Sequence, residues 1–217
     1  MATTMAMGVG SGTVHVRAGG GMEAGSAGGR RGRGWVGCAG RTCRSAVGRA
    51  GVRKQAAAHA RCTYEEVKVE TLKGVALHDI TPQVRGLVER LGVRQGTVTV
   101  LSRHTTTAVV INEMEGRLVD DTRQYLLRLA PPGFPYLHND LHVRSGPPDW
   151  PGGDEAWRAQ EPENAHSHLL SMLLGNSESV PVVDGQLALG TWQSLILVEL
   201  DGPRTRTVGV QVVGHDD

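Results

Sequence analysis

The chain has 217 residues and a formal net charge of +1, but this near-neutral total hides two unlike parts. Residues 1–60 carry a net charge of +8 with a single acid, whereas residues 61–217 carry −7. No run approaches the ~18 apolar residues of a membrane-spanning helix, and three scattered cysteines exclude a disulfide framework or a cysteine-based metal site.

The first 60 residues are rich in Arg, Gly and Ala and nearly free of acids. Such a segment cannot bury enough apolar surface to offset the entropy lost on ordering, so we expect disorder. Its composition, without a continuous apolar run, is typical of an organellar transit peptide. The high content of Ala and Gly favours the chloroplast as the destination, with a mitochondrion or the cytoplasm as alternatives. A competing interpretation is an RG-type nucleic-acid arm at Gly29–Gly34.

The remainder, residues 62–214, is predicted to form one domain. Alternation of apolar and charged residues over 63–72 predicts a half-buried strand. Thr81 as the N-cap and Pro82 as the first helical residue predict a helix, which Gly92 ends.

Two β-branched runs, 97–101 and 105–111, predict two strands or one bent strand around His104. Asn112, with Glu115 three residues later, is a candidate cap for a second helix. A proline pair ends the apolar stripe of that helix.

Residues 131–161 show little periodicity and predict a long loop of the kind that often carries function. A third helix is predicted over 163–174. Four strands are predicted to follow, at 179–183, 186–189, 194–200 and 205–213. Because helices separate the early strands and an antiparallel meander closes the chain, we expect an α+β fold. It is a single compact domain with a mostly antiparallel or mixed sheet and about three helices.

Glu199 lies in the segment Ser194–Leu200, which is apolar on both faces and predicts a central strand. Period-two geometry places Glu199 on the face of Leu195 and Leu197. A buried carboxylate there needs a cation, a metal or several donors. The alternative is a strand-end carboxylate that reaches water.

Histidines are the other candidates for chemistry. If the tract 137–142 is extended, His138, Asp140 and His142 share one face, which suits metal ligation or acid–base work. On the third helix, His166 and His168 are two positions apart and point to opposite sides, so at most one enters a given site.

Six segments match the motifs of one known family, in order, within residues 62–214. They are His104–Thr106, Ile111–Glu113, Pro135–Asn139, Ala165–Gly175, Val183–Gln193 and Asp201–Arg204. In these segments the chain resembles the YjbQ family, the so-called secondary thiamine-phosphate synthase enzymes. Glu199 falls on the family acid and His168 on a family histidine. The chain departs from the family at 144–162, where many relatives have a short link.

This resemblance implies a homotrimer and a thiamine-phosphate synthase activity. In that reaction a hydroxymethylpyrimidine diphosphate is coupled to a thiazole phosphate with loss of pyrophosphate. The expected catalytic residues are His104, His138, His168 and Glu199. A divalent metal, zinc or magnesium, is expected on His138, His168 and Glu199. The expected substrate-binding residues are Thr105, Thr106, Asn112, Glu113, Thr191, Trp192 and Gln193.

Two other functions are compatible with these residues: a metal-dependent hydrolase of a small phosphorylated molecule, and a non-catalytic ligand-binding trimer. In each case the expected partner is a phosphorylated small molecule. Neither nucleic acid nor a membrane is an expected partner.

Overall fold

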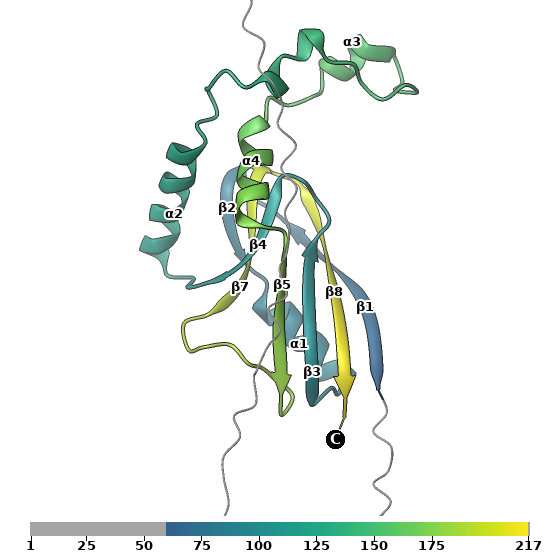
Figure 1. Cartoon of the computed structure of the whole chain (residues 1–217), viewed down its shortest axis with the longest axis vertical. Helices are drawn as coiled ribbons and strands as arrows, with labels where there is room; N and C mark the ends of the chain where they lie inside the picture. The colour runs from purple at the N-terminus through teal and green to yellow at the C-terminus, as the bar shows by residue number, and fades with distance from the viewer. Residues whose placement is uncertain (1–59, 217) are drawn as a thin grey trace, which may run out of the picture. The chain divides into compact units, whose positions relative to one another are not determined.

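The computed structural model describes residues 60–216, and these form one α+β domain (Figure 1). Nearly all of the predicted transit peptide lies outside the described residues. The strands are β1 (Arg61–Glu70), β2 (Gly74–Asp79), β3 (Gln95–Ser102), β4 (Thr107–Asn112), β5 (Ser177–Val183), β6 (Gln186–Leu187), β7 (Ser194–Gly202) and β8 (Thr205–His215). The α-helices are α1 (Thr81–Leu91), α2 (Gly116–Leu129), α3 (Gly153–Arg158) and α4 (Ala165–Leu174).

The strands form two sheets in which every neighbouring pair is antiparallel. One sheet has the order β1-β8-β3-β5-β6 and the other β2-β7-β4. The α+β prediction is therefore confirmed, but the predicted closing meander is wrong. Consecutive strands β7 and β8 lie in different sheets, because β7 is apolar on both faces and needs cover on both sides.

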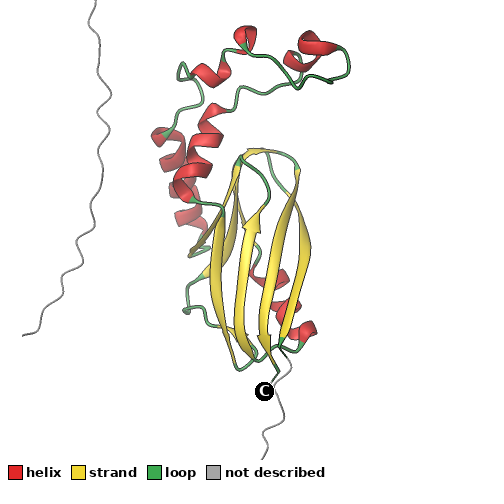
Figure 2. Ribbon diagram, turned by 45° about the vertical axis from the view of Figure 1, so that its right-hand side comes forward, coloured by secondary structure: helices red, strands yellow, loops and turns green. Residues whose placement is uncertain are grey.

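Two hydrophobic clusters provide that cover. Leu195 and Leu197 of β7 pack with valines of the five-stranded sheet and with α1. On the opposite face, Ile196 and Val198 pack with residues of α2 and α4. The domain is thus layered as five-stranded sheet, three-stranded sheet, then two helices (Figure 2). The strand that carries Glu199 lies in the middle layer.

Two helix starts differ from the predicted ones. Ile80 occupies the N-cap position of α1, and the Thr81 hydroxyl instead accepts from the backbone N–H of Leu195 in β7. For α2, the cap is Glu115, whose carboxylate accepts from the N–H groups of Arg117 and Leu118. A carboxylate at a helix N-terminus also offsets the positive end of the helix dipole.

The segment between α2 and α4 is more ordered than the predicted loop. It contains α3 and two short 3₁₀ turns, Leu137–Asn139 and Leu141–Val143. Trp157 is buried, with the Arg144 guanidinium 5.0 Å above its ring. The Arg158 guanidinium donates to the Arg144 carbonyl and to the Asp154 carboxylate. This segment is therefore ordered by a small core of its own, although its sequence lacks the hydrophobic periodicity of a helix or a strand. Within residues 60–216, no helix is long and apolar enough to cross a membrane.

Candidate functional site

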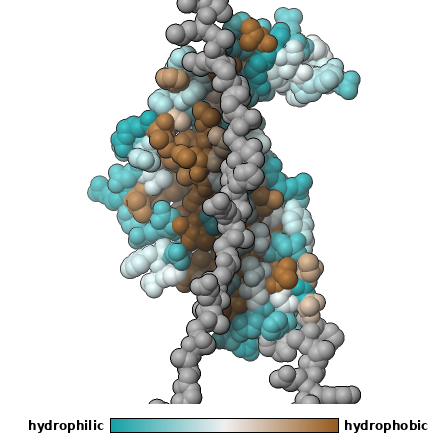
Figure 3. Space-filling model, viewed as in Figure 1, coloured by the Kyte–Doolittle hydropathy of each residue, from teal (hydrophilic) through white to brown (hydrophobic). Residues whose placement is uncertain are grey.

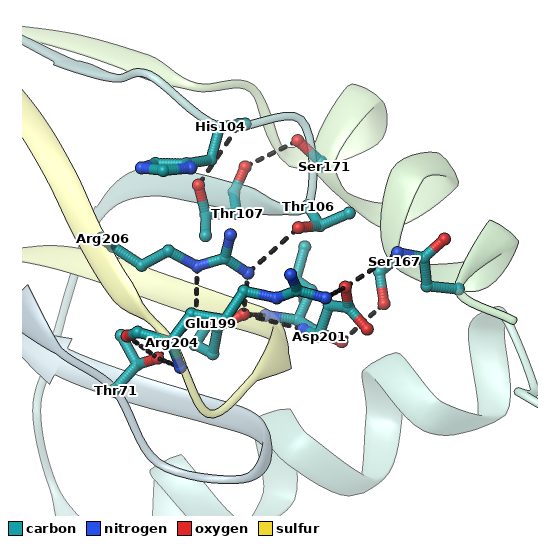
Figure 4. A network of polar contacts seen from close by, with 12 residues as sticks. Thr71, His104, Thr106, Thr107, Ser167, Ser171, Glu199, Asp201, Arg204 and Arg206 are labelled. Atoms are coloured by element: carbon teal, nitrogen blue, oxygen red, sulfur yellow. Dashed lines mark hydrogen bonds and ion pairs between the residues drawn. The ribbon is translucent and has the colours of Figure 1, made fainter. Parts of the chain in front are cut away.

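A buried ion pair joins the two sheets at the end where β7 turns into β8. Glu199 is fully buried, and Arg206, in β8, is 3% exposed. Arg206 Nε donates to Glu199 Oε2, and Nη2 donates to Oε1, each at 2.6 Å (Figure 4). This two-point geometry is the strongest form of carboxylate recognition by arginine.

Further donors saturate the Glu199 carboxylate. The backbone N–H groups of Leu200 and Asp201 donate to Oε1 at 2.9 and 2.8 Å, and the Thr71 hydroxyl lies 2.7 Å from Oε2. Burial alone would raise the pKa of Glu199, but Arg206 and these hydrogen bonds outweigh burial and hold it below its ordinary value. Glu199 is therefore an anion whose charge is neutralised within the protein.

The predicted three-ligand metal site does not fit this geometry. Arg206 is the cation that the buried Glu199 carboxylate requires. Both carboxylate oxygens already accept hydrogen bonds from it. Among residues 60–216, no group of three or more His, Cys, Asp or Glu side chains is arranged to hold a metal ion. The expectation that Glu199 joins His138 and His168 as a ligand is thus corrected.

Sequence reasoning overlooked Arg206, although a signal exists. Arg206 precedes Val208 and Val210 in β8 at period-two spacing, and all three side chains are buried. A cation on the buried face of a strand needs an anion, just as Glu199 needs a cation. The link between β7 and β8 is short enough to bring the two together.

Beside this ion pair lies a polar pocket of about 330 Å³. Its lining combines three arginines and two histidines with hydroxyl and carboxylate groups. The lining residues are Arg103, His104, Thr105, Thr106, Glu161, Pro162, Asn164, His168, Asp201, Arg204 and Arg206. They come from the β3–β4 connection, from the end of β7, from the β7–β8 connection, from β8, from α4 and from the segment before α4. Four of the sequence-predicted residues, His104, Thr105, Thr106 and His168, are brought together here.

The three arginines differ in their partners. Nη2 of Arg206 also donates to the Thr106 hydroxyl at 3.0 Å, which leaves Nη1 as the guanidinium nitrogen that these contacts do not use. Arg204 pairs with Asp201 at 2.9 Å, and Arg103 pairs with Glu66. The side chains of Arg103 and Arg204 are about half exposed. They can therefore turn toward an anion in the pocket with little cost in desolvation.

His104 is held as a neutral donor. The backbone N–H of Thr207 donates to His104 Nε2 at 2.9 Å, so the ring hydrogen resides on Nδ1. Burial and the nearby Arg206 charge both lower the pKa of His104. A neutral imidazole with a fixed N–H is suited to hydrogen-bond a phosphate oxygen.

His138 and His168 form a second feature of this end of the domain. Their rings pack edge to face with centroids 4.8 Å apart, and His138 Nε2 is buried without a hydrogen-bond partner in the described structure. Burial, followed by the neighbouring His138, lowers the pKa of His168. The tract 137–142 is not extended but folds into two 3₁₀ turns, so His138, Asp140 and His142 do not share a strand face as predicted.

The other predicted substrate-binding residues lie elsewhere. Glu113, Thr191, Trp192 and Gln193 line a separate pocket of about 320 Å³, and Asn112 is exposed at the end of β4. In the register of β4 and β7, Thr107 pairs with Glu199 but Asn112 pairs with Ser194. Five residue steps at ~3.3 Å each therefore separate the two groups by about 16 Å along the strands.

An apolar groove of about 620 Å³ is lined by the end of α2, by the segment that follows it and by α4. Met172 and Leu173 of α4 are 79% and 65% exposed, and Phe134 is 58% exposed. Figure 3 shows hydrophobic side chains gathered on this helical side of the domain. Monomeric proteins rarely leave a large contiguous apolar patch exposed to water.

Comparison with known proteins places this geometry in a family. The model of the family described as "UPF0047 protein YjbQ-like" matches residues 65–215. A UPF0047 protein of Methanothermobacter thermautotrophicus is 40% identical over 150 residues, which cover 69% of this chain and 91% of that protein. Another from Archaeoglobus fulgidus is 42% identical over 148 residues, covering 68% of this chain and 99% of that protein.

Solved structures agree with the sequence matches. A YbjQ-like protein of unknown function from Sulfolobus solfataricus superposes with a TM-score of 0.61 at 32% identity, covering 72% of this chain and all of that one. A hypothetical protein from Aeropyrum pernix gives a TM-score of 0.59 at 35% identity and covers 70% of this chain and 99% of that one.

Proposed function

This chain belongs to the UPF0047 family of YjbQ-like proteins, and we propose that it couples a hydroxymethylpyrimidine diphosphate to a thiazole phosphate. The observation that carries the proposal is the polar pocket, in which Arg103, Arg204 and Arg206 converge with His104. Guanidinium groups and fixed N–H donors are the groups that bind diphosphate.

The reaction needs mainly electrostatic help. The bond between the pyrimidinylmethyl carbon and the diphosphate oxygen breaks, and its electron pair leaves on pyrophosphate. The lone pair of the thiazole nitrogen then forms the new C–N bond, which makes the ring nitrogen cationic. Charge grows on the leaving group, so preorganised donors that contact it lower the barrier.

Each residue of the pocket has a role in this scheme. His104 Nδ1–H and the Arg206 guanidinium are fixed by Thr207 and Glu199, so they contact the diphosphate without prior rearrangement. Arg103 and Arg204 neutralise its outer oxygens. His168 packs on His138, and its lowered pKa keeps the imidazole neutral. Its ring N–H can donate a hydrogen bond to an oxygen of the leaving diphosphate, since the coupling itself transfers no proton.

We further propose that the protein is a homotrimer in which the apolar groove faces a second copy of the chain. Large apolar side chains such as Met172 and Leu173 are too exposed for a free surface. Assembly also offers a role for the Trp192 pocket, which lies far from the arginines within one subunit but can approach the arginine pocket of a neighbour.

The test is a turnover assay on the purified full chain with the two synthetic substrates, following pyrophosphate release and the coupled product separately. The expected result is both products in equal amounts. Pyrophosphate or phosphate without coupling would show a hydrolase instead. Binding without any product would show a ligand-binding protein.

Arg103→Gln and Arg204→Gln, which change half-exposed arginines, test whether turnover belongs to this pocket or to a contaminating enzyme. Arg90→Gln is the matched control because Arg90 pairs with Glu65 on the surface away from the pocket. The pocket variants are expected to lose about tenfold or more in turnover, as for other groups that stabilise transition-state charge. Equal turnover in all three variants would contradict the proposal.

A further inference from the structure

The polar pocket contains a buried acceptor that the described protein leaves unsatisfied. Asn164 directly precedes α4 and is 6% exposed. Its Nδ2 donates to Asp201 Oδ2 at 2.8 Å, whereas its Oδ1 is buried and has no hydrogen-bond partner among residues 60–216. Buried acceptors in native proteins are normally paired, so an unpaired one on a residue that lines a pocket points to a ligand.

The orientation of this amide follows from its partner. An ionised carboxylate oxygen can only accept, so the nitrogen of Asn164 must face Asp201 and the oxygen must face away from it. Asp201 is itself held by Arg204, whose Nη2 donates to the same Oδ2. Asn164 Oδ1 is therefore a fixed acceptor rather than one of two interchangeable ends.

The surroundings of Asn164 differ from the arginine side of the pocket. The carboxylates of Asp201 and Glu161 line the pocket with it. Glu161 is held by Arg144 at 3.2 Å. The pocket thus offers acceptors on the Asn164 side, whereas His104 and Arg206 offer donors.

We infer that the pocket takes a phosphorylated molecule that also carries an N–H donor, and that Asn164 Oδ1 accepts a hydrogen bond from it. Asn164 is then a specificity-determining residue: a ligand without the donor leaves the buried oxygen unpaired, and that loss weakens its binding. This inference rests on the proposed function, because it assumes that the arginine side holds phosphate.

The experiment compares two probes by calorimetry on the full chain: pyrimidin-5-ylmethyl phosphate and its 4-amino derivative. They share the phosphate and differ in one amino group. The expected result is about tenfold tighter binding of the amino probe, since an unpaired buried acceptor costs enough to change affinity by that factor. Equal affinities would overturn the inference and leave the phosphate pocket standing. Failure of both probes to bind would contradict the proposed function and, with it, this inference.

Asn164→Leu removes the acceptor in a side chain of the same branched shape and should reduce the preference for the amino probe to within about twofold. The matched control is Asn176→Leu, because Asn176 is exposed and lines the adjacent pocket, not this one. It should keep the full preference. A preference that survives Asn164→Leu would also overturn the inference. The wild-type comparison decides the matter if Asn164→Leu does not fold.

Discussion

Glu199 and Arg206 meet across the two sheets, seven residues apart in sequence, with Nε and Nη2 each 2.6 Å from a carboxylate oxygen. Both side chains lie at the end of the sandwich where the polar pocket opens. Because Glu199 neutralises Arg206 and fixes its guanidinium, the pair both connects the layers and orients a donor toward the pocket (Figure 4).

Removing one partner of this pair should destabilise the protein strongly. Glu199→Gln leaves a buried guanidinium without its anion, and Arg206→Met leaves a buried carboxylate without its cation. Each is expected to lower the free energy of unfolding by about 3–5 kcal/mol, as for other broken buried pairs. Urea unfolding measures this. The double variant has no unpaired charge, so its loss should be smaller than the sum of the two.

The control for that series is Glu65→Gln, which removes an exposed ion pair with Arg90. Solvent screens such pairs, and the urea midpoint should not change measurably. If Glu199→Gln proved as silent as Glu65→Gln, the ion pair would not contribute to stability.

Stability should decline with acid in two steps. Burial lowers the pKa of His78, His104, His166 and His168 below the ordinary 6.5. The unfolded chain therefore takes up protons first, and stability falls as pH drops below 6.5. Glu199 has a lowered pKa, so its contribution is present above 4.5 and is lost as pH falls through the folded value. Urea midpoints measured from pH 8 to 4 test this, and a midpoint that rises between pH 7 and 5.5 would contradict it.

The sequence predicts β7 well, together with the strand face on which Glu199 lies. A strand that is apolar on both faces must be buried between two layers. It fails for β2, where Val75 and Ala76 are both buried and a register shift interrupts the pairing with β7. The alternation that identifies a strand is absent there.

Strand partners are the harder part. β1 pairs with β8 through contacts such as Thr63 with Val212, which are distant in sequence. No local pattern encodes such a pairing, so the meander was the simplest prediction and was wrong. For the same reason, a pocket assembled from several separate segments can be predicted only residue by residue. Asn164 and Arg103 are visible as polar residues, but nothing near them in the sequence says that they meet.

The two histidines of α4 offer an internal comparison. His168 lines the polar pocket and packs on His138, whereas His166 contacts the Ser167 hydroxyl through Nε2 and lies outside the pocket lining. His168→Asn should therefore lower turnover by about 10²-fold, the lower end of the range for a lost donor that stabilises transition-state charge. His166→Asn should retain turnover within about twofold. Thermal unfolding of both variants shows whether either change is structural. The reverse order of effects would place the chemistry on the other side of α4.

The apolar face of α4 makes a prediction about assembly. Met172 and Leu173 are exposed on the helical layer beside Phe134, and burying such side chains against another copy contributes about 25 cal/mol for each Å² removed from water. Light scattering of the full chain should give about three times the chain mass of 23.1 kDa. Met172→Glu should lower the measured mass to that of the monomer, because a buried unpaired carboxylate at the interface is costly.

Lys73→Glu, an exposed change outside the groove, is the control for added negative charge and should leave the trimer intact. A wild-type monomer at every concentration would refute the trimer. A trimer that survives Met172→Glu would show that the subunits meet through another face.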